Sequence, residues 1–94
     1  MRLQGLKCVV TGGASGIGAA TARRFAGEGA LVCILDRDFP AAQALAVELG
    51  QDHFAVELDV RLEHAVEQAA GEVYTRWGHI DVLVNNAGSE LNKT

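Results

Sequence analysis

The chain has 94 residues and a mass of 9.9 kDa, which is enough for one small domain. Apolar residues make up 49% of it and charged residues 21%, with a single proline, which excludes a disordered tail or a collagen-like repeat. Eight basic residues against twelve acidic ones give a formal net charge of −4, and this balance argues against a nucleic-acid partner, which would favour a basic surface.

Short apolar runs and helical patterns alternate along the first half of the chain. The run 6–10 is rich in β-branched residues and stops at a glycine turn, which is typical of a strand buried on both faces of a parallel sheet. Helical spacing follows over 16–28, and a second strand is predicted over 31–35. The residues expected on the apolar face of the first helix are Ile17, Ala20, Thr21 and Phe25.

The alternation repeats in the second half. A helix over 39–49, with a proline at its start and a glycine after its end, is followed by a strand over 53–58. A longer helix is predicted over 61–77 and a fourth strand over 80–84. The long helix carries apolar residues at spacings of three and four, namely Leu62, Val66, Ala69, Val73 and Trp77.

The resulting order, βαβαβαβ, indicates the fold class. Strands separated by helices of this length pair in parallel through right-handed crossovers, so residues 1–88 are predicted to form an α/β doubly wound sheet and 89–94 a polar tail. A strand order of 3-2-1-4 would place two helices on one face and one on the other. The fourth strand would then be an open edge beside bare apolar sheet, from which we expect self-association or dependence on a further segment.

A glycine-rich turn, Thr-Gly-Gly-Ala-Ser-Gly-Ile-Gly at 11–18, joins the first strand to the first helix. Glycines allow the chain to reverse tightly, the backbone to approach a ligand, and the helix to pack near the sheet. The helix N-terminus adds unpaired N–H groups and the positive end of a dipole, so a diphosphate fits there. Alanines rather than lysine follow Gly18, which argues against a P-loop. A tight turn without a ligand is the alternative.

Asp36 strengthens the dinucleotide interpretation. It lies 18 residues after Gly18, at the end of the second predicted strand, where a ribose-binding acid is expected. A carboxylate there accepts hydrogen bonds from both ribose hydroxyls and repels a 2′-phosphate by about 4 kcal/mol at ~4 Å. Arg37 softens this repulsion, but an Asp-Arg pair still favours the bare hydroxyl, so the sequence predicts NAD(H) over NADP(H). The alternative is that Asp36 is only a turn residue.

Two further segments point to a known family. They are Leu58-Asp59-Val60 and the run Asp-Val-Leu-Val-Asn-Asn-Ala-Gly at 81–88. Together with the glycine turn and Asp36, they closely resemble the N-terminal part of a short-chain dehydrogenase/reductase, over about 3–88. The resemblance implies a Rossmann-type NAD-binding sheet of strand order 3-2-1-4, cut short after the fourth strand.

The resemblance also assigns cofactor-binding residues. Those that would cradle the diphosphate are Gly12, Ser15, Gly16, Ile17 and Gly18. Those that would line the cofactor beyond the fourth strand are Asn86, Ala87 and Gly88. Asp36, with Arg37 beside it, would hold the adenosine ribose, while Asp59 and Val60 would contact adenine, the Asp59 carboxylate accepting from the exocyclic amine. A turn at Asn85-Asn86 that only organises the backbone is compatible with this role.

Catalytic residues are where the chain departs from the family. Family members transfer hydride with a tyrosine and a lysine four residues later, helped by an upstream serine and asparagine. The only tyrosine here is Tyr74, with Gly78 four residues on, so Tyr74 is predicted to be a packing residue and no catalytic residue is assigned. We expect the chain alone to be inactive on a small alcohol or ketone until the missing half is supplied. The alternatives are a non-catalytic adenine-nucleotide-binding module and an interaction protein pairing through its open sheet edge.

The remaining reactive side chains suggest structural roles. His64 and Glu67 lie one turn apart without a third ligand, so no metal site is predicted. Cys8 and Cys33 fall in neighbouring strands and are expected to be buried and unreactive. The apolar stretch 30–35 is far shorter than the roughly 20 residues of a membrane span, and the start lacks a signal peptide's apolar run. We therefore expect no membrane partner and a reducing, cytoplasmic setting.

Overall fold

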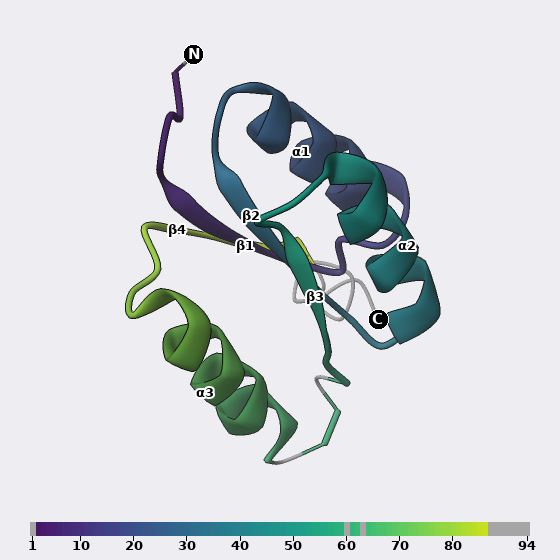
Figure 1. The fold of residues 1–94 in the computed structure, drawn as a ribbon. Coiled ribbons are helices and arrows are strands. Elements are labelled where there is room, and N and C mark those ends of the chain that lie inside the picture. Colours follow the sequence, from purple (N-terminus) through teal and green to yellow (C-terminus); the bar gives the residue numbers. More distant parts are fainter. Residues whose placement is uncertain (1, 60, 63, 87–94) are drawn as a thin grey trace.

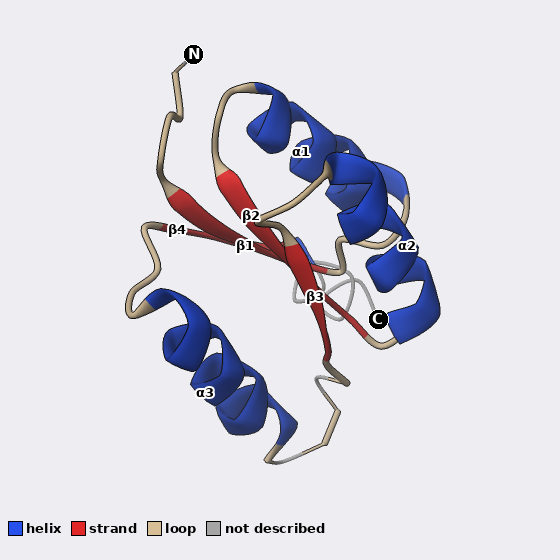
Figure 2. Cartoon of the chain, viewed as in Figure 1, coloured by secondary structure: helices blue, strands red, loops and turns tan. Residues whose placement is uncertain are grey.

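Strands and helices alternate through residues 2–59, 61–62 and 64–86, which are the residues that the computed structural model describes (Figure 2). Within them the strands are β1 (Lys7–Thr11), β2 (Leu31–Asp36), β3 (Phe54–Glu57) and β4 (Val82–Asn85). The helices are α1 (Gly16–Gly27), α2 (Phe39–Leu49) and α3 (Ala65–Trp77). The predicted order βαβαβαβ is confirmed, with strand ends shifted by one or two residues. The expected tail, 89–94, lies outside the described residues.

The strands form one parallel sheet in the order β3-β2-β1-β4. At the centre, Val9 of β1 is paired with Cys33 of β2 on one side and Leu83 of β4 on the other. Cys33 is paired in turn with Phe54 of β3. This is the predicted doubly wound, Rossmann-like arrangement, in which the connections leave β1 toward β2 and reach β4 on the opposite side.

Helices cover the two faces of the sheet unequally, as Figure 1 shows. The core beneath α1 and α2 contains Cys8, Val10, Val32, Ile34, Ala42 and Leu45, among others. The core beneath α3 contains Val9, Cys33, Leu35, Phe54, Val56, Leu58, Ala69 and Val73. The central strands β1 and β2 contribute to both cores because successive side chains of a strand point to opposite faces.

The two cysteines lie on opposite faces of the sheet, Cys8 toward α1 and α2 and Cys33 toward α3. Both are fully buried free thiols, as predicted. Burial raises the pKa of each thiol, that of Cys33 to about 12, because a thiolate is poorly solvated in an apolar core. These thiols are therefore structural.

The buried face of α1 differs from the predicted one. Its buried residues are Gly18, Ala19 and Ala22, whereas Ile17 is 77% exposed. The small side chains allow the helix axis to lie close to the sheet, and a larger residue on that face would hold it away. Of the predicted face, Phe25 packs against the core but Ile17 and Ala20 are exposed. The prediction missed Gly18, Ala19 and Ala22 because glycine and alanine contribute little to an apolar pattern.

The helix predicted over 61–77 begins instead at Ala65. Among the described residues before it, the Leu62 N–H donates to the Asp59 carbonyl oxygen and the Ala65 N–H donates to the Leu62 carbonyl oxygen, as in turns. Of the predicted stripe, Ala69 and Val73 are buried and Trp77 is half-buried, its ring meeting Phe54 edge-on with centroids 5.0 Å apart. The other members of the stripe, Leu62 and Val66, are exposed.

Tyr74 is 51% exposed, so its predicted role as a packing residue was wrong. It follows the buried Val73 on α3, and a helix turns by about 100° per residue, so the next side chain leaves the buried stripe.

The sheet is bare beside β4. Leu83 lies opposite Val9 on the face that α3 covers, yet Leu83 is 62% exposed while Val9 is 1% exposed. In the described part of the chain, β4 pairs with β1 alone and is an edge strand. Within the same residues, no helix is long and apolar enough to cross a membrane.

Candidate dinucleotide-binding site

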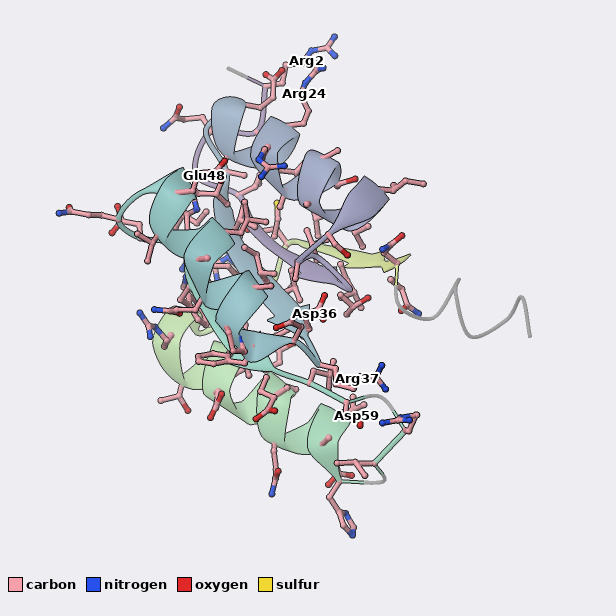
Figure 3. All side chains as sticks on the ribbon, turned by 90° about the vertical axis from the view of Figure 1, so that its right-hand side faces the viewer. Arg2, Arg24, Asp36, Arg37, Glu48 and Asp59 are labelled. Atoms are coloured by element: carbon pink, nitrogen blue, oxygen red, sulfur yellow. The ribbon has the colours of Figure 1, made fainter. Side chains whose placement is uncertain are left out.

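The glycine turn lies at the carboxyl end of β1, where it leads into α1. The chain connections on the two sides of β1 diverge here, toward β2 and toward β4. In open α/β sheets this divergence leaves a crevice outside the carboxyl ends of the strands, where ligands bind. In Figure 3, Asp36, Arg37 and Asp59 lie one below the other, just at or beyond the ends of β2 and β3.

Two glycines of the turn have backbone angles that favour glycine. Gly12 has φ +64° and Gly16 has φ +58°, both in the left-handed region. The Gly12 N–H donates to the Leu35 carbonyl oxygen at 2.7 Å, which holds the turn against the end of β2. A Cβ placed on Gly16 would meet no described atom within 4 Å, so this side of the turn is open.

The other glycines allow close packing. A Cβ on Gly18 would collide with the Gly12 carbonyl oxygen and lie 3.0 Å from Asn86 Nδ2. Asn86 Nδ2 donates to that same carbonyl oxygen at 3.2 Å, which ties the end of β4 to the turn. Gly13, which the sequence did not single out, is buried, and a Cβ there would lie 2.9 Å from Ile34 Cγ2. Gly13 therefore has a packing role.

The first turn of α1 is open to an anion. Ser15 is the N-cap residue, with extended backbone and no capping hydrogen bond from its side chain. The first turn of α1, all of it described, contains no acidic residue. Its backbone N–H groups carry the positive end of the helix dipole, and Ser15, Gly16 and Ile17 are all exposed. This end of the helix therefore suits a phosphate group.

Asp36 faces the glycine turn. Its Oδ2 accepts from the Ala14 N–H at 3.0 Å, and its Oδ1 accepts from the Asp38 N–H at 2.9 Å. A carboxylate has about four acceptor positions, so the described part of the chain leaves two for other donors. The sequence identified Asp36 but not Ala14, because a backbone donor leaves no mark in a residue pattern.

Asp59 lies just beyond β3 and is held by Arg61. Arg61 Nε and Nη2 donate to Oδ1 and Oδ2 at 2.9 and 2.8 Å, and the Arg61 N–H donates to Oδ1 at 3.0 Å. The side-chain hydrogen bonds from Arg61, then its backbone N–H and, more weakly, the charges of Arg61 and Arg37 together lower the pKa of the Asp59 carboxyl to about 2. The Leu58 N–H donates to the Asp36 carbonyl oxygen at 3.0 Å, which joins the ends of β2 and β3.

The structure thus brings together the glycine turn, Asp36 and Asn86, with Asp59 and Arg37 nearby. Three predicted site residues, Val60, Ala87 and Gly88, lie outside the described residues. Elsewhere, a groove of about 720 Å³ between β3 and α3 contains none of the predicted site residues. No group of three or more potential metal ligands occurs among the described side chains.

The family model for short chain dehydrogenases matches residues 7–94. The chain belongs to the short-chain dehydrogenase family. The resemblance carried by the glycine turn, Asp36 and the Asn-Asn-Ala-Gly segment is thereby confirmed.

Relatives in this family share the sequence along nearly the whole chain. It is 45% identical to sorbitol dehydrogenase of Cereibacter sphaeroides over 87 residues, which cover 93% of this chain and 34% of the relative. It is 44% identical to D-threitol dehydrogenase of Mycolicibacterium smegmatis over 90 residues, which cover 93% of this chain and 35% of that relative. The chain therefore spans about a third of the length of these short-chain dehydrogenases.

A solved structure shares the fold. It is the crystal structure of 3-ketoacyl-(acyl-carrier-protein) reductase from Brucella melitensis, complexed with NADH. The TM-score is 0.83 at 38% sequence identity, over 86% of this chain and 33% of that one. The short-chain dehydrogenase fold of the chain thus corresponds to about a third of a complete reductase.

Proposed function

We propose that this chain is the NAD(H)-binding segment of a short-chain dehydrogenase that transfers hydride between the nicotinamide cofactor and an alcohol or ketone. The observation that carries the proposal is the Asp36 carboxylate, which is fixed against the glycine turn by the Ala14 N–H. This bond keeps a ribose-binding acid beside a phosphate-binding helix end. The Brucella reductase with the same fold contains NADH, which supports the same ligand class here.

Each part of the cofactor has a matching group in the chain. The residues that would hold the diphosphate are Gly12, Ser15, Gly16, Ile17 and Gly18. Asp36 would accept from the adenosine ribose hydroxyls through its two remaining acceptor positions, and Asp59 would accept from the exocyclic amine of adenine. Asn86 would line the cofactor beyond β4. For Val60 the proposal retains the adenine contact, and for Ala87 and Gly88 the cofactor contacts beyond β4, that the resemblance implies. When bound, the nicotinamide supplies or accepts the hydride.

We expect NAD to bind better than NADP. The Asp36 carboxylate would repel a 2′-phosphate, and two such charges at ~4 Å cost about 4 kcal/mol at an effective dielectric near 20. Arg37 follows Asp36 directly, but its charge also acts on Asp59, which lowers the pKa of that carboxyl.

Hydride transfer would require a tyrosine with a lysine four residues later, and this chain does not contain that pair. Tyr74 is exposed on α3, and Gly78, the residue four positions later, is the C-cap of that helix. We propose that the chain alone binds cofactor without transferring hydride, which leaves the non-catalytic nucleotide-binding module as the alternative. Adding the remaining two thirds of a relative and following reduced-cofactor absorbance separates the two. Restored turnover favours the dehydrogenase.

The binding proposal is tested by isothermal titration of the 94-residue chain with NAD and NADP at equal ionic strength. We expect NAD to bind more tightly by roughly tenfold or more, equivalent to ~1.4 kcal/mol after solvent screening. Equal affinities would contradict the role of Asp36 in cofactor choice. No heat with either cofactor would contradict the proposed function itself.

Self-association is a second candidate property, favoured by the exposed Leu83 on the edge strand β4. Exposed apolar sheet next to an open edge invites pairing with another chain. A cytoplasmic setting, expected from the sequence, also stays a prediction.

A further inference from the structure

We propose that Arg61 is a positioning residue for adenine recognition, since it holds the Asp59 carboxylate so that one acceptor position stays open for the exocyclic amine. The inference rests on the proposed function, because it requires the adenine of the cofactor to lie beside Asp59. Arg61 itself lies two residues beyond Asp59, in the turn that leads to α3.

The geometry of the pair is two-pronged. Arg61 Nε donates to Asp59 Oδ1 at 2.9 Å and Nη2 donates to Oδ2 at 2.8 Å, so two nitrogens of the guanidinium bind the two carboxylate oxygens. The Arg61 N–H adds a third bond, to Oδ1 at 3.0 Å. The Asp59 side chain is 16% exposed and that of Arg61 62% exposed, so the guanidinium lies on the outer side of the carboxylate.

Counting acceptor positions shows what remains for a ligand. A carboxylate has about four lone-pair positions, two on each oxygen. Arg61 fills both positions on Oδ1 and one on Oδ2. Among the hydrogen bonds of the described residues, one position on Oδ2 is left, which suits a single donor such as an exocyclic amine. A carbonyl oxygen at the same place would face a carboxylate that has nothing to donate.

Charge supports the same role. Without Arg61, Asp59 would be a second anion near Asp36, and both would repel the diphosphate of the cofactor. The guanidinium offsets one of these charges, and its hydrogen bonds lower the pKa of the Asp59 carboxyl, which favours the ionised, hydrogen-bond-accepting form.

A structural role alone is the competing explanation. The Arg61 N–H bond to Asp59 shapes the turn and would exist with other side chains at position 61. The two explanations differ in one respect. A turn-shaping residue affects all cofactors alike, whereas a residue that aims the Asp59 carboxylate affects discrimination at the adenine amine.

The experiment compares NAD with nicotinamide hypoxanthine dinucleotide, in which a carbonyl replaces the adenine amine. Both are titrated by calorimetry into the unaltered chain, Arg61→Ala and Arg61→Lys. The unaltered chain should prefer NAD by roughly tenfold or more, as expected for a hydrogen bond to a charged group. Arg61→Ala should reduce this preference to within about threefold, and Arg61→Lys, which keeps the charge but not the fork, should restore part of it.

Arg23→Ala is the matched control. Arg23 makes a comparable exposed, two-pronged pair with Glu48, at 2.8 and 3.3 Å. In Figure 3 Glu48 lies far from Asp59. This variant should keep the full preference for NAD. If Arg61→Ala does not fold, the test uses Arg61→Lys, which should lose part of the preference for NAD over the hypoxanthine analogue.

The outcomes separate this inference from the proposed function. If Arg61→Ala weakens both dinucleotides equally and keeps the preference, Arg61 only shapes the turn and the inference is overturned. If the unaltered chain binds NAD without any preference over the hypoxanthine analogue, Asp59 does not read the amine, and the inference fails while NAD binding stands. If NAD does not bind at all, both fail.

Discussion

The Asp36 carboxylate accepts a hydrogen bond from the Ala14 N–H at 3.0 Å, and this bond joins the end of β2 to the turn that follows β1. The residues are 22 positions apart, so the contact exists only because the parallel sheet places the two carboxyl ends side by side. One acid therefore shapes the turn and offers its remaining acceptor positions to a ligand. Binding and local stability are coupled through Asp36.

Replacement of Asp36 should affect both properties. Asp36→Ala leaves the Ala14 and Asp38 N–H groups without this acceptor, which should destabilise the fold by about 1–3 kcal/mol. It should also weaken NAD binding and narrow the preference over NADP, whereas Asp36→Asn, which keeps one acceptor oxygen, should lose less stability. Urea denaturation and calorimetric titration measure the two effects. Unchanged binding of both cofactors to Asp36→Ala would show that the ribose assignment is wrong.

Gly18→Ala should disrupt the glycine turn. The added methyl group would collide with the Gly12 carbonyl oxygen, which is backbone and cannot move without moving the turn. We expect a loss of about 1–3 kcal/mol in the free energy of unfolding, together with weaker NAD binding. Gly71→Ala, in α3, is the control: its Cβ would meet no described atom within 4 Å, so it should stabilise by about 0.5–1 kcal/mol. If the urea midpoint shifted by the same amount in the same direction in both variants, this account of Gly18 would be refuted.

His53 should make the protein less stable at mildly acidic pH. Its Nδ1 accepts from the Val32 N–H at 3.0 Å, and burial lowers its pKa below the ordinary value. Since the folded pKa is the lower one, the stabilisation is complete above about pH 6.5 and is lost as the pH falls through the folded pKa. His53→Gln keeps an acceptor but does not titrate, so its stability should vary less between pH 7 and 5. Parallel pH profiles for the two proteins would contradict this role.

Cys33 should behave in the opposite sense, at high pH. Burial raises its pKa to about 12, so its contribution to stability is complete below the unfolded value near 8.5 and is lost as the pH rises toward 12. At pH 8 neither thiol should react with a disulfide reagent in the folded protein, and both should react in urea. The alkaline loss of stability should be smaller in Cys33→Ala. Rapid labelling of the folded protein would show that the β1–β2 core is open.

Leu83 should control association. It is an exposed apolar side chain on the bare part of the sheet, so Leu83→Glu should shift the chain toward the monomer. Leu62→Glu, at a similarly exposed leucine outside the strands, is the control and should leave association unchanged. Sedimentation velocity over a range of concentrations measures both. A sharp monomer for the unaltered chain, with cooperative unfolding, would contradict self-association.

The strand order and the place of the glycine turn could be predicted because both follow from short-range patterns and the handedness of crossovers. Other features depend on three-dimensional fit. The buried face of α1 was missed because Gly18, Ala19 and Ala22 pack by being small, which an apolar pattern does not register.

The hydrogen-bond partners of Asp36 and Asp59 could not be predicted from the sequence either. The bond from Ala14 to Asp36 comes from a backbone group, and the fork of Arg61 on Asp59 depends on rotamers in a turn. An arginine two residues after a conspicuous aspartate was the one available signal for that pair. Tyr74 was predicted to be a packing residue, but it follows the buried Val73, and adjacent residues on a helix point in different directions.

The central claim is that the glycine turn and Asp36 form one cofactor site, and an NMR titration of the ¹⁵N-labelled chain with NAD tests it most directly. The account predicts that the largest amide shifts occur at Gly12, Ala14, Gly16 and Gly18 and at Asp36, and that NADP produces the same pattern only at higher concentration. Shifts confined to the groove between β3 and α3, or no shifts at millimolar NAD, would contradict it.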